Sequence, residues 1–204
     1  LARRGAKAMV IACNTATAAA AEAIRAASIL PIVALEPGVK PAAALTRSGA
    51  IGVLATTRTL QSARFQRLVA NYAQHLQVLT QACPGLADAI EAVGPDSPEI
   101  ERLLDRFVTP LAKAKVDVVV LGCTHYPWVA EGIAQRMPAG TTLLDTGEAV
   151  ARQLERLLAA SQLLGGGQGR LTLATSGAPS EVSVTVNRLL GQKMHVEHWE
   201  PGHD

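Results

Sequence analysis

The chain has 204 residues, of which 49% are hydrophobic and 18% charged, and its formal net charge is +2. This composition is that of a globular protein with enough apolar residues for one large or two small cores. The small net charge and an aromatic content of 3% argue against a nucleic-acid partner, which a basic surface with stacking aromatics would bind.

No apolar run approaches the roughly 20 residues that a membrane span needs, so we expect no membrane association. The three cysteines lack paired spacing, and the chain has no Cys/His ligand cluster typical of zinc. Unpaired cysteines are typical of a reducing compartment. The sequence therefore predicts a cytoplasmic protein without a disulfide framework or a metal site.

Short apolar runs alternate with helical patterns along the chain. An apolar run that ends in turn residues favours a buried strand, whereas a run of alanines or apolar residues at helical spacing favours a helix. In chain order, the predicted strands are 9–11, 31–35, 50–55, 76–80, 118–121, 141–144, 170–174 and 194–199, and the predicted helices are 16–27, 39–47, 60–72, 98–113, 148–158 and 178–190. This alternation indicates crossover units, parallel pairing and the α/β class.

Two of these strands are followed by a small residue and a cysteine: Ala12 precedes Cys13, and Gly122 precedes Cys123. Ligands bind outside the carboxyl ends of strands in open α/β sheets, so we expect both cysteines to face a common cleft. Each precedes a helix start, where backbone N–H groups favour a thiolate that can act as a base or nucleophile. Structural burial is the plain alternative for a lone cysteine, but the repeated pattern favours the functional interpretation.

Polar side chains accompany both cysteines. His125 lies two residues past Cys123, close enough to exchange protons with a substrate or to tune the thiol. Short donors at the same strand ends suit a carboxylate or an ammonium group, although these residue types equally favour helix capping. They are Asn14, Thr15, Thr56, Thr59 and Thr124. Cys83, before Pro84, has no adjacent hydroxyl or histidine and is predicted to be structural.

Residues 11–17, Ile-Ala-Cys-Asn-Thr-Ala-Thr, and residues 121–127, Leu-Gly-Cys-Thr-His-Tyr-Pro, resemble the two cysteine signatures of the cofactor-independent glutamate racemases. The resemblance continues through 52–59, 82–91 and 175–177. It implies two pseudo-symmetric α/β domains with mainly parallel sheets flanked by helices and an active site in the cleft between them. We expect residues 1–36 plus 145–204 to form the first domain and residues 37–144 the second.

The resemblance also implies an isomerase that interconverts L- and D-glutamate and supplies D-glutamate for the peptidoglycan of the cell wall. One thiolate removes the α-proton and the opposite thiol protonates the other face, without a cofactor. By this resemblance Cys13 and Cys123 are the two bases, and His125 and Glu91 assist on the Cys123 side. The five short polar residues named above would bind the substrate, a small molecule. The oligomeric state is left open, a homodimer included.

Two alternatives share some of these features. An aspartate or related amino-acid racemase would share the fold and both cysteines, but aspartate racemases usually have glutamate after Cys-Thr, where this chain has His125. A non-catalytic amino-acid-binding fragment is disfavoured by the presence of both cysteines, His125 and Glu91. The family's leading strand and Asp-Ser-Gly loop are not found in this sequence. We therefore expect this chain alone to be a weak or unstable enzyme with an unpaired strand edge near Val10.

Overall fold

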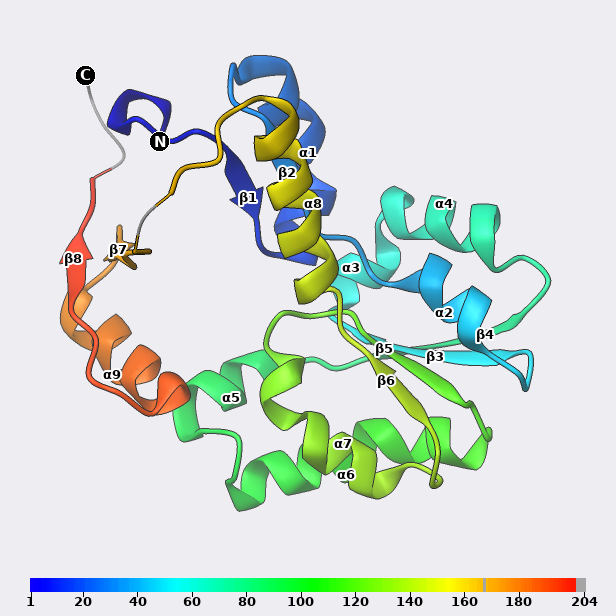
Figure 1. The fold of residues 1–204 in the computed structure, drawn as a ribbon. Coiled ribbons are helices and arrows are strands. Elements are labelled where there is room, and N and C mark those ends of the chain that lie inside the picture. Colours follow the sequence, from blue (N-terminus) through cyan, green and yellow to red (C-terminus); the bar gives the residue numbers. More distant parts are fainter. Residues whose placement is uncertain (167, 201–204) are drawn as a thin grey trace.

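Strands and helices alternate along the chain (Figure 1). The structure is a computed structural model and describes residues 1–166 and 168–200. Its strands are β1 (Met9–Ile11), β2 (Ile32–Ala34), β3 (Ala50–Ala55), β4 (Gln77–Ala82), β5 (Val118–Leu121), β6 (Thr142–Leu144), β7 (Leu173–Thr175) and β8 (Val196–His198). The predicted α/β class is confirmed.

The helices cover most of the segments between the strands. They are α1 (Asn14–Ala27), α2 (Val39–Leu45), α3 (Thr57–Gln61), α4 (Ala63–Tyr72), α5 (Leu86–Val93), α6 (Pro98–Lys113), α7 (Ala130–Arg136), α8 (Gly147–Ala160) and α9 (Pro179–Leu190), with 3-10 turns η1 (Ala2–Arg4) and η2 (Tyr126–Val129). In the described part of the chain, every helix is too short or too polar to serve as a transmembrane span.

Among the described residues the strands pair in three parallel sheets, β1-β2, β4-β3-β5-β6 and β7-β8. The four-stranded sheet uses only residues 50–144, and the two small sheets use residues outside 37–144. The division into domains at these bounds stays a prediction. What matters for the site is that β1 and β5, the strands before the two cysteines, belong to different sheets.

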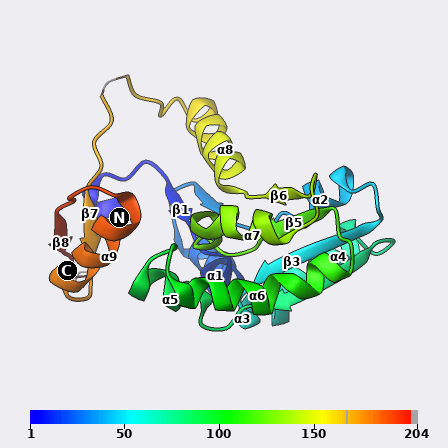
Figure 2. The same ribbon diagram turned by 90° about the horizontal axis from the view of Figure 1, so that it is seen from below.

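The central strand β5 is buried on both faces, which explains its uninterrupted apolar sequence. Val119 and Leu121 pack in a core with residues of α5, α6 and α7. Val118 and Val120 point the other way and pack in a core with residues of α2 and α4. The helices accordingly lie on both sides of the sheet, with α5, α6 and α7 nearest the viewer in Figure 2. Because helices pack on both faces of β5, the position of the chain segment that follows it is well defined.

The structure adds two helices, α5 and α7, that are not among the predicted elements, and several predicted bounds differ by a few residues. Two of the differences have a local physical cause. The single helix predicted over 60–72 is two helices, α3 and α4, because Ser62 has an extended backbone and its hydroxyl accepts the N–H of Phe65, which starts a new helix. The strand predicted over 76–80 extends to Ala82, in register with β3. Both differences arise where a cap or a neighbouring strand overrides the local pattern.

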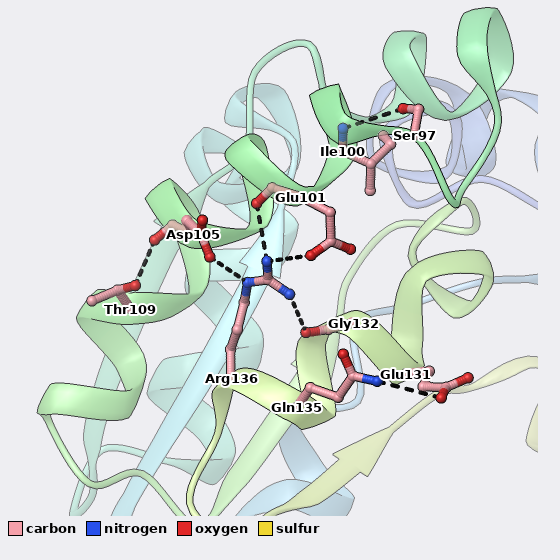
Figure 3. A network of polar contacts seen from close by, with 9 residues as sticks. All are labelled: Ser97, Ile100, Glu101, Asp105, Thr109, Glu131, Gly132, Gln135 and Arg136. Carbon is pink, nitrogen blue, oxygen red and sulfur yellow. Dashed lines mark hydrogen bonds and ion pairs between the residues drawn. The ribbon is translucent and has the colours of Figure 1, made fainter.

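An arginine joins α7 to α6 on the outer side of the four-stranded sheet (Figure 3). Arg136 donates from Nη2 to Glu101 Oε2 at 2.6 Å, from Nε to Asp105 Oδ1 at 2.7 Å and from Nη1 to the carbonyl of Gly132 at 2.9 Å. Its side chain is only 15% exposed. The planar guanidinium can meet all three acceptors at once, which a lysine could not do.

Replacing Arg136 with alanine should therefore lower the free energy of unfolding by about 1–2 kcal/mol, since charge-assisted hydrogen bonds are lost but their carboxylate partners remain partly solvated. Urea denaturation measures this change. Arg102→Ala removes an exposed arginine of α6 and should stay within about 0.5 kcal/mol of the parent. Equal effects of the two substitutions would contradict the proposed role of Arg136.

Candidate active site

Cys13 lies between the end of β1 and the start of α1. It is the N-cap residue of the helix, with an extended backbone at φ −153° and ψ 124°, and its carbonyl accepts the N–H of Thr17 at 2.8 Å. The side chain is half-buried. The thiol stands at the N-terminal end of α1, and Cys13 Sγ has no hydrogen-bond partner among the described residues.

Cys123 follows β5 through a glycine that no larger residue could replace without movement. Gly122 N donates to the carbonyl of Leu54 at 2.7 Å. A Cβ at Gly122 would lie 2.8 Å from that same oxygen and 2.9 Å from the Cβ of Ala55, both closer than real contacts allow. The close approach to β3 fixes the path of the chain as it leaves the sheet, and Cys123 is buried directly after it.

Asn14 brings the two cysteine loops together. Its Nδ2 donates to the carbonyl of Gly122 at 2.9 Å, across 108 residues of sequence, and this bond is buried. The residue after Cys13 is thus tied to the residue before Cys123, although the two cysteines follow strands of different sheets. Asn14 Oδ1 is also buried and accepts no hydrogen bond from any described residue, so it is an unsatisfied acceptor beside the two cysteines' loops.

His125 and Glu91 form a chain of polar contacts behind Cys123. His125 Nδ1 lies 3.7 Å from Cys123 Sγ, and His125 Nε2 lies 2.6 Å from Glu91 Oε1. The contact with Cys123, followed by the Glu91 carboxylate, raises the pKa of His125 from 6.5 to about 9, although partial burial acts against this shift. His125 is therefore an imidazolium near neutral pH, held between an acid and a thiol.

Three threonine hydroxyls meet beside this pair of loops. Thr15 Oγ1 lies 2.9 Å from Thr56 Oγ1 and 3.1 Å from Thr59 Oγ1, and the last two are 3.0 Å apart. Thr15 is in the first turn of α1, whereas Thr56 is the N-cap of α3 and also accepts the N–H of Thr59 at 3.2 Å. Hydroxyls at helix N-termini suit a negatively charged group.

The last two predictions concern Thr124, in the second cysteine motif, and Cys83, which lies outside both motifs. Thr124 is half-buried between Cys123 and His125 in sequence and forms no side-chain hydrogen bond with a described residue. Cys83 is buried, and this burial raises the pKa of its thiol to about 12, so it stays neutral in the range where enzymes work. A neutral buried thiol fits the structural interpretation of Cys83.

One contact to the site comes from a residue that the sequence analysis does not single out. Arg188, near the end of α9, donates to the backbone carbonyls of Glu91 and Ala92. No sequence signal would have found it, because 97 residues separate Arg188 from Glu91 and an arginine in the last turn of a helix is ordinary. Within the described chain, no group of three His, Cys, Asp or Glu side chains has an arrangement that could hold a metal ion.

The chain is similar to known proteins in sequence and in structure. Residues 1–154 match the family model for Asp/Glu/Hydantoin racemase. A glutamate racemase of Pseudomonas syringae pv. tomato is 55% identical over 171 residues, which are 83% of this chain and 62% of that relative. The chain therefore spans less than two thirds of the length of this relative.

The chain also has the fold of solved glutamate racemase structures. The glutamate racemase isoform RacE1 of Bacillus anthracis has a TM-score of 0.82 and 29% identity, with 96% of this chain and 74% of that chain covered. An Escherichia coli glutamate racemase in complex with L-glutamate and the activator UDP-MurNAc-ala has a TM-score of 0.78 and 28% identity, with 93% and 72% covered.

The raised pKa of His125 makes a prediction about stability and pH. Because the folded-state value of about 9 lies above 6.5, the imidazolium stabilises the folded state fully below pH 6.5, and this contribution is lost as the pH rises through 9. Glu91 is half-exposed, so we expect a contribution of about 1 kcal/mol after solvent screening. Urea denaturation from pH 6 to pH 9.5 should show a steeper loss of stability for the parent than for His125→Asn. Parallel pH profiles would contradict the ion pair.

Proposed function

Because the chain belongs to the Asp/Glu/hydantoin racemase family, we propose that it interconverts L- and D-glutamate with Cys13 and Cys123 as the two acid–base groups. The observation that carries this proposal is the buried bond from Asn14 Nδ2 to the carbonyl of Gly122. It holds two thiol-bearing loops from different sheets against each other. Inverting a stereocentre needs a base on one face of Cα and an acid on the other, and two thiols on loops held in contact would suit these two roles.

In the proposed reaction one cysteine acts as a thiolate and the other as a thiol. The thiolate removes the proton from Cα, and the electron pair of the broken C–H bond delocalises into the α-carboxylate. The thiol on the opposite face then donates its proton to Cα, which gives the other enantiomer and leaves that cysteine as the thiolate. The two cysteines have exchanged protonation states, so the enzyme is set for the reverse direction.

His125 and Glu91 support the Cys123 side of this cycle. The His125 imidazolium, 3.7 Å from Cys123 Sγ, would lie beside the negative charge that Cys123 carries when it is the base. Glu91 at 2.6 Å from the other ring nitrogen favours the protonated ring and fixes its orientation. We propose that neither group contacts the reacting carbon and that both act through Cys123.

The polar side chains around the thiols provide contacts for an amino acid. We propose that Asn14 Oδ1, buried without a described partner, accepts a hydrogen bond from the substrate ammonium. The hydroxyls of Thr15, Thr56 and Thr59 would turn from one another and donate to a carboxylate, and Thr124 would donate beside Cys123. The proposed substrate contacts therefore come from the two cysteine loops and from the start of α3.

The proposed substrate is glutamate, because the relatives and solved structures compared above are glutamate racemases and one of them is in complex with L-glutamate. We propose that D-glutamate from this reaction serves the synthesis of peptidoglycan in the cytoplasm. The free cysteines support that compartment, since both thiols must stay reduced to exchange protons.

Single substitutions of the two cysteines test the proposal. Cys13→Ser and Cys123→Ser should each slow racemisation by at least about 100-fold, the lower range of what a positioned acid or base contributes. Each variant keeps one thiol and should still eliminate the leaving group from a glutamate analogue substituted at Cβ, because elimination needs only proton abstraction. The two variants should prefer opposite enantiomers of that analogue, which chiral chromatography of the remaining substrate measures.

Cys83→Ala is the matched control, since it removes a buried thiol that we place outside the site. It should retain racemisation within a few-fold of the parent. A shared enantiomer preference of the two serine variants, or a loss of racemisation in Cys83→Ala as large as theirs, would contradict the assignment of the two bases.

A further inference from the structure

The C-terminal helix contacts the end of the helix that carries Glu91. Arg188 Nη1, in the last turn of α9, donates to the carbonyl oxygens of Glu91 and Ala92, both at 2.6 Å. Figure 1 shows α9 beside the end of α5, and Leu189 packs against the core that contains α5. One arginine thus serves as a cap for a helix that lies 97 residues earlier in the chain.

These carbonyls are ones that α5 cannot satisfy by itself. The helix spans only Leu86–Val93, and its C-cap N–H, from Gly94, takes the carbonyl of Ile90. The following carbonyls lie beyond the last helical bond and carry the negative end of the helix dipole. A guanidinium supplies the hydrogen atoms and positive charge that this end requires.

The backbone at Gly94 leaves room for the arginine. Gly94 has a φ of +84°, which a residue with a side chain rarely adopts, and a Cβ there would lie 3.2 Å from Arg188 Cδ. The turn after α5 therefore lets the side chain of Arg188 pass close to the backbone. A side chain at position 94 would crowd the path of Arg188 to the two carbonyls.

The position of the Glu91 carboxylate depends on this helix end. Its side chain is 52% exposed, so packing does little to hold it against His125. What fixes its 2.6 Å contact with His125 Nε2 is the backbone of the last turn of α5. The ends of short helices fray when their terminal groups lack partners.

We propose that Arg188 is a positioning residue for the Cys123 side of the site, which holds the end of α5 so that Glu91 stays on His125. The proposal rests on the proposed function, because His125 and Glu91 matter for catalysis only if Cys123 is one of the two bases. Arg188 does not contact the substrate and acts through α5. The effect is one-sided, since among the described residues Cys13 has no such chain of contacts behind it.

The first test uses elimination from the β-substituted glutamate analogue. In the Cys13→Ser background, where Cys123 abstracts the proton, adding Arg188→Ala should lower kcat roughly tenfold, a part of what positioned acid–base groups contribute. In the Cys123→Ser background the same substitution should leave kcat within twofold. Equal slowing in both backgrounds, or no slowing in either, would overturn the proposal.

Two further variants separate positioning from a general disturbance of α9. Arg188→Lys keeps one charged donor and should restore part of the rate, whereas Arg188→Gln should behave like alanine. Val184→Ala, one turn earlier on α9 at an exposed position, should change neither background. If Val184→Ala slows the Cys13→Ser variant as much as Arg188→Ala does, the effect belongs to the helix and the role of Arg188 is refuted.

The second test does not depend on activity. NMR titration of the His125 ring, assigned by its loss in His125→Asn, should give a pKa near 9 in the parent and a lower value, shifted part of the way to 6.5, in Arg188→Ala. An unchanged titration of His125 would overturn the proposal even in a protein without turnover. If the pKa of His125 is lowered in Arg188→Ala but the parent does not racemise glutamate, Arg188 does position Glu91 and the proposed function is refuted.

Discussion

The site depends on one buried hydrogen bond, from Asn14 Nδ2 to the carbonyl of Gly122. Both partners are fixed by the fold: Asn14 begins α1, and Gly122 lies so close to β3 that no side chain fits there. The bond therefore joins two rigid strand ends from separate sheets. Because an unpaired buried amide or carbonyl is costly, this bond keeps the loops that carry Cys13 and Cys123 in contact.

The two thiols have different surroundings, so the two sides of the candidate site are not equivalent. Cys123 is backed by His125 and Glu91, with the pKa of His125 raised to about 9. Cys13 stands at the start of α1 and has no hydrogen-bond partner among the described residues. A racemase must run equally well in both directions overall, but each half of its cycle can use different means to form its thiolate. Contacts such as that of Arg188 would act on one half alone.

Local sequence patterns predicted the elements better than their contacts. The apolar runs before Cys13 and Cys123 and the helix predicted over 98–113 each depend on residues close together in the sequence, and the structure has a strand or helix at each of these places. The contacts that build the site join residues far apart, such as Asn14 with Gly122 and Arg188 with Glu91. No local pattern encodes such a pair, because either partner alone looks like a helix start, a glycine turn or a surface arginine. The family resemblance supplied candidate roles for His125 and Glu91, but not the helix end that carries Glu91.

The most direct test of two opposed thiols is the fate of the α-proton in deuterated water. If one thiol removes the proton and the other protonates the opposite face, L-glutamate should give D-glutamate with deuterium at Cα from the first turnovers. The L-glutamate that remains should keep its original proton at early times, and the same should hold with the enantiomers exchanged. A product that retains the substrate's own proton, or deuterium that enters the remaining substrate as fast as the product, would show a single base serving both faces and contradict the account.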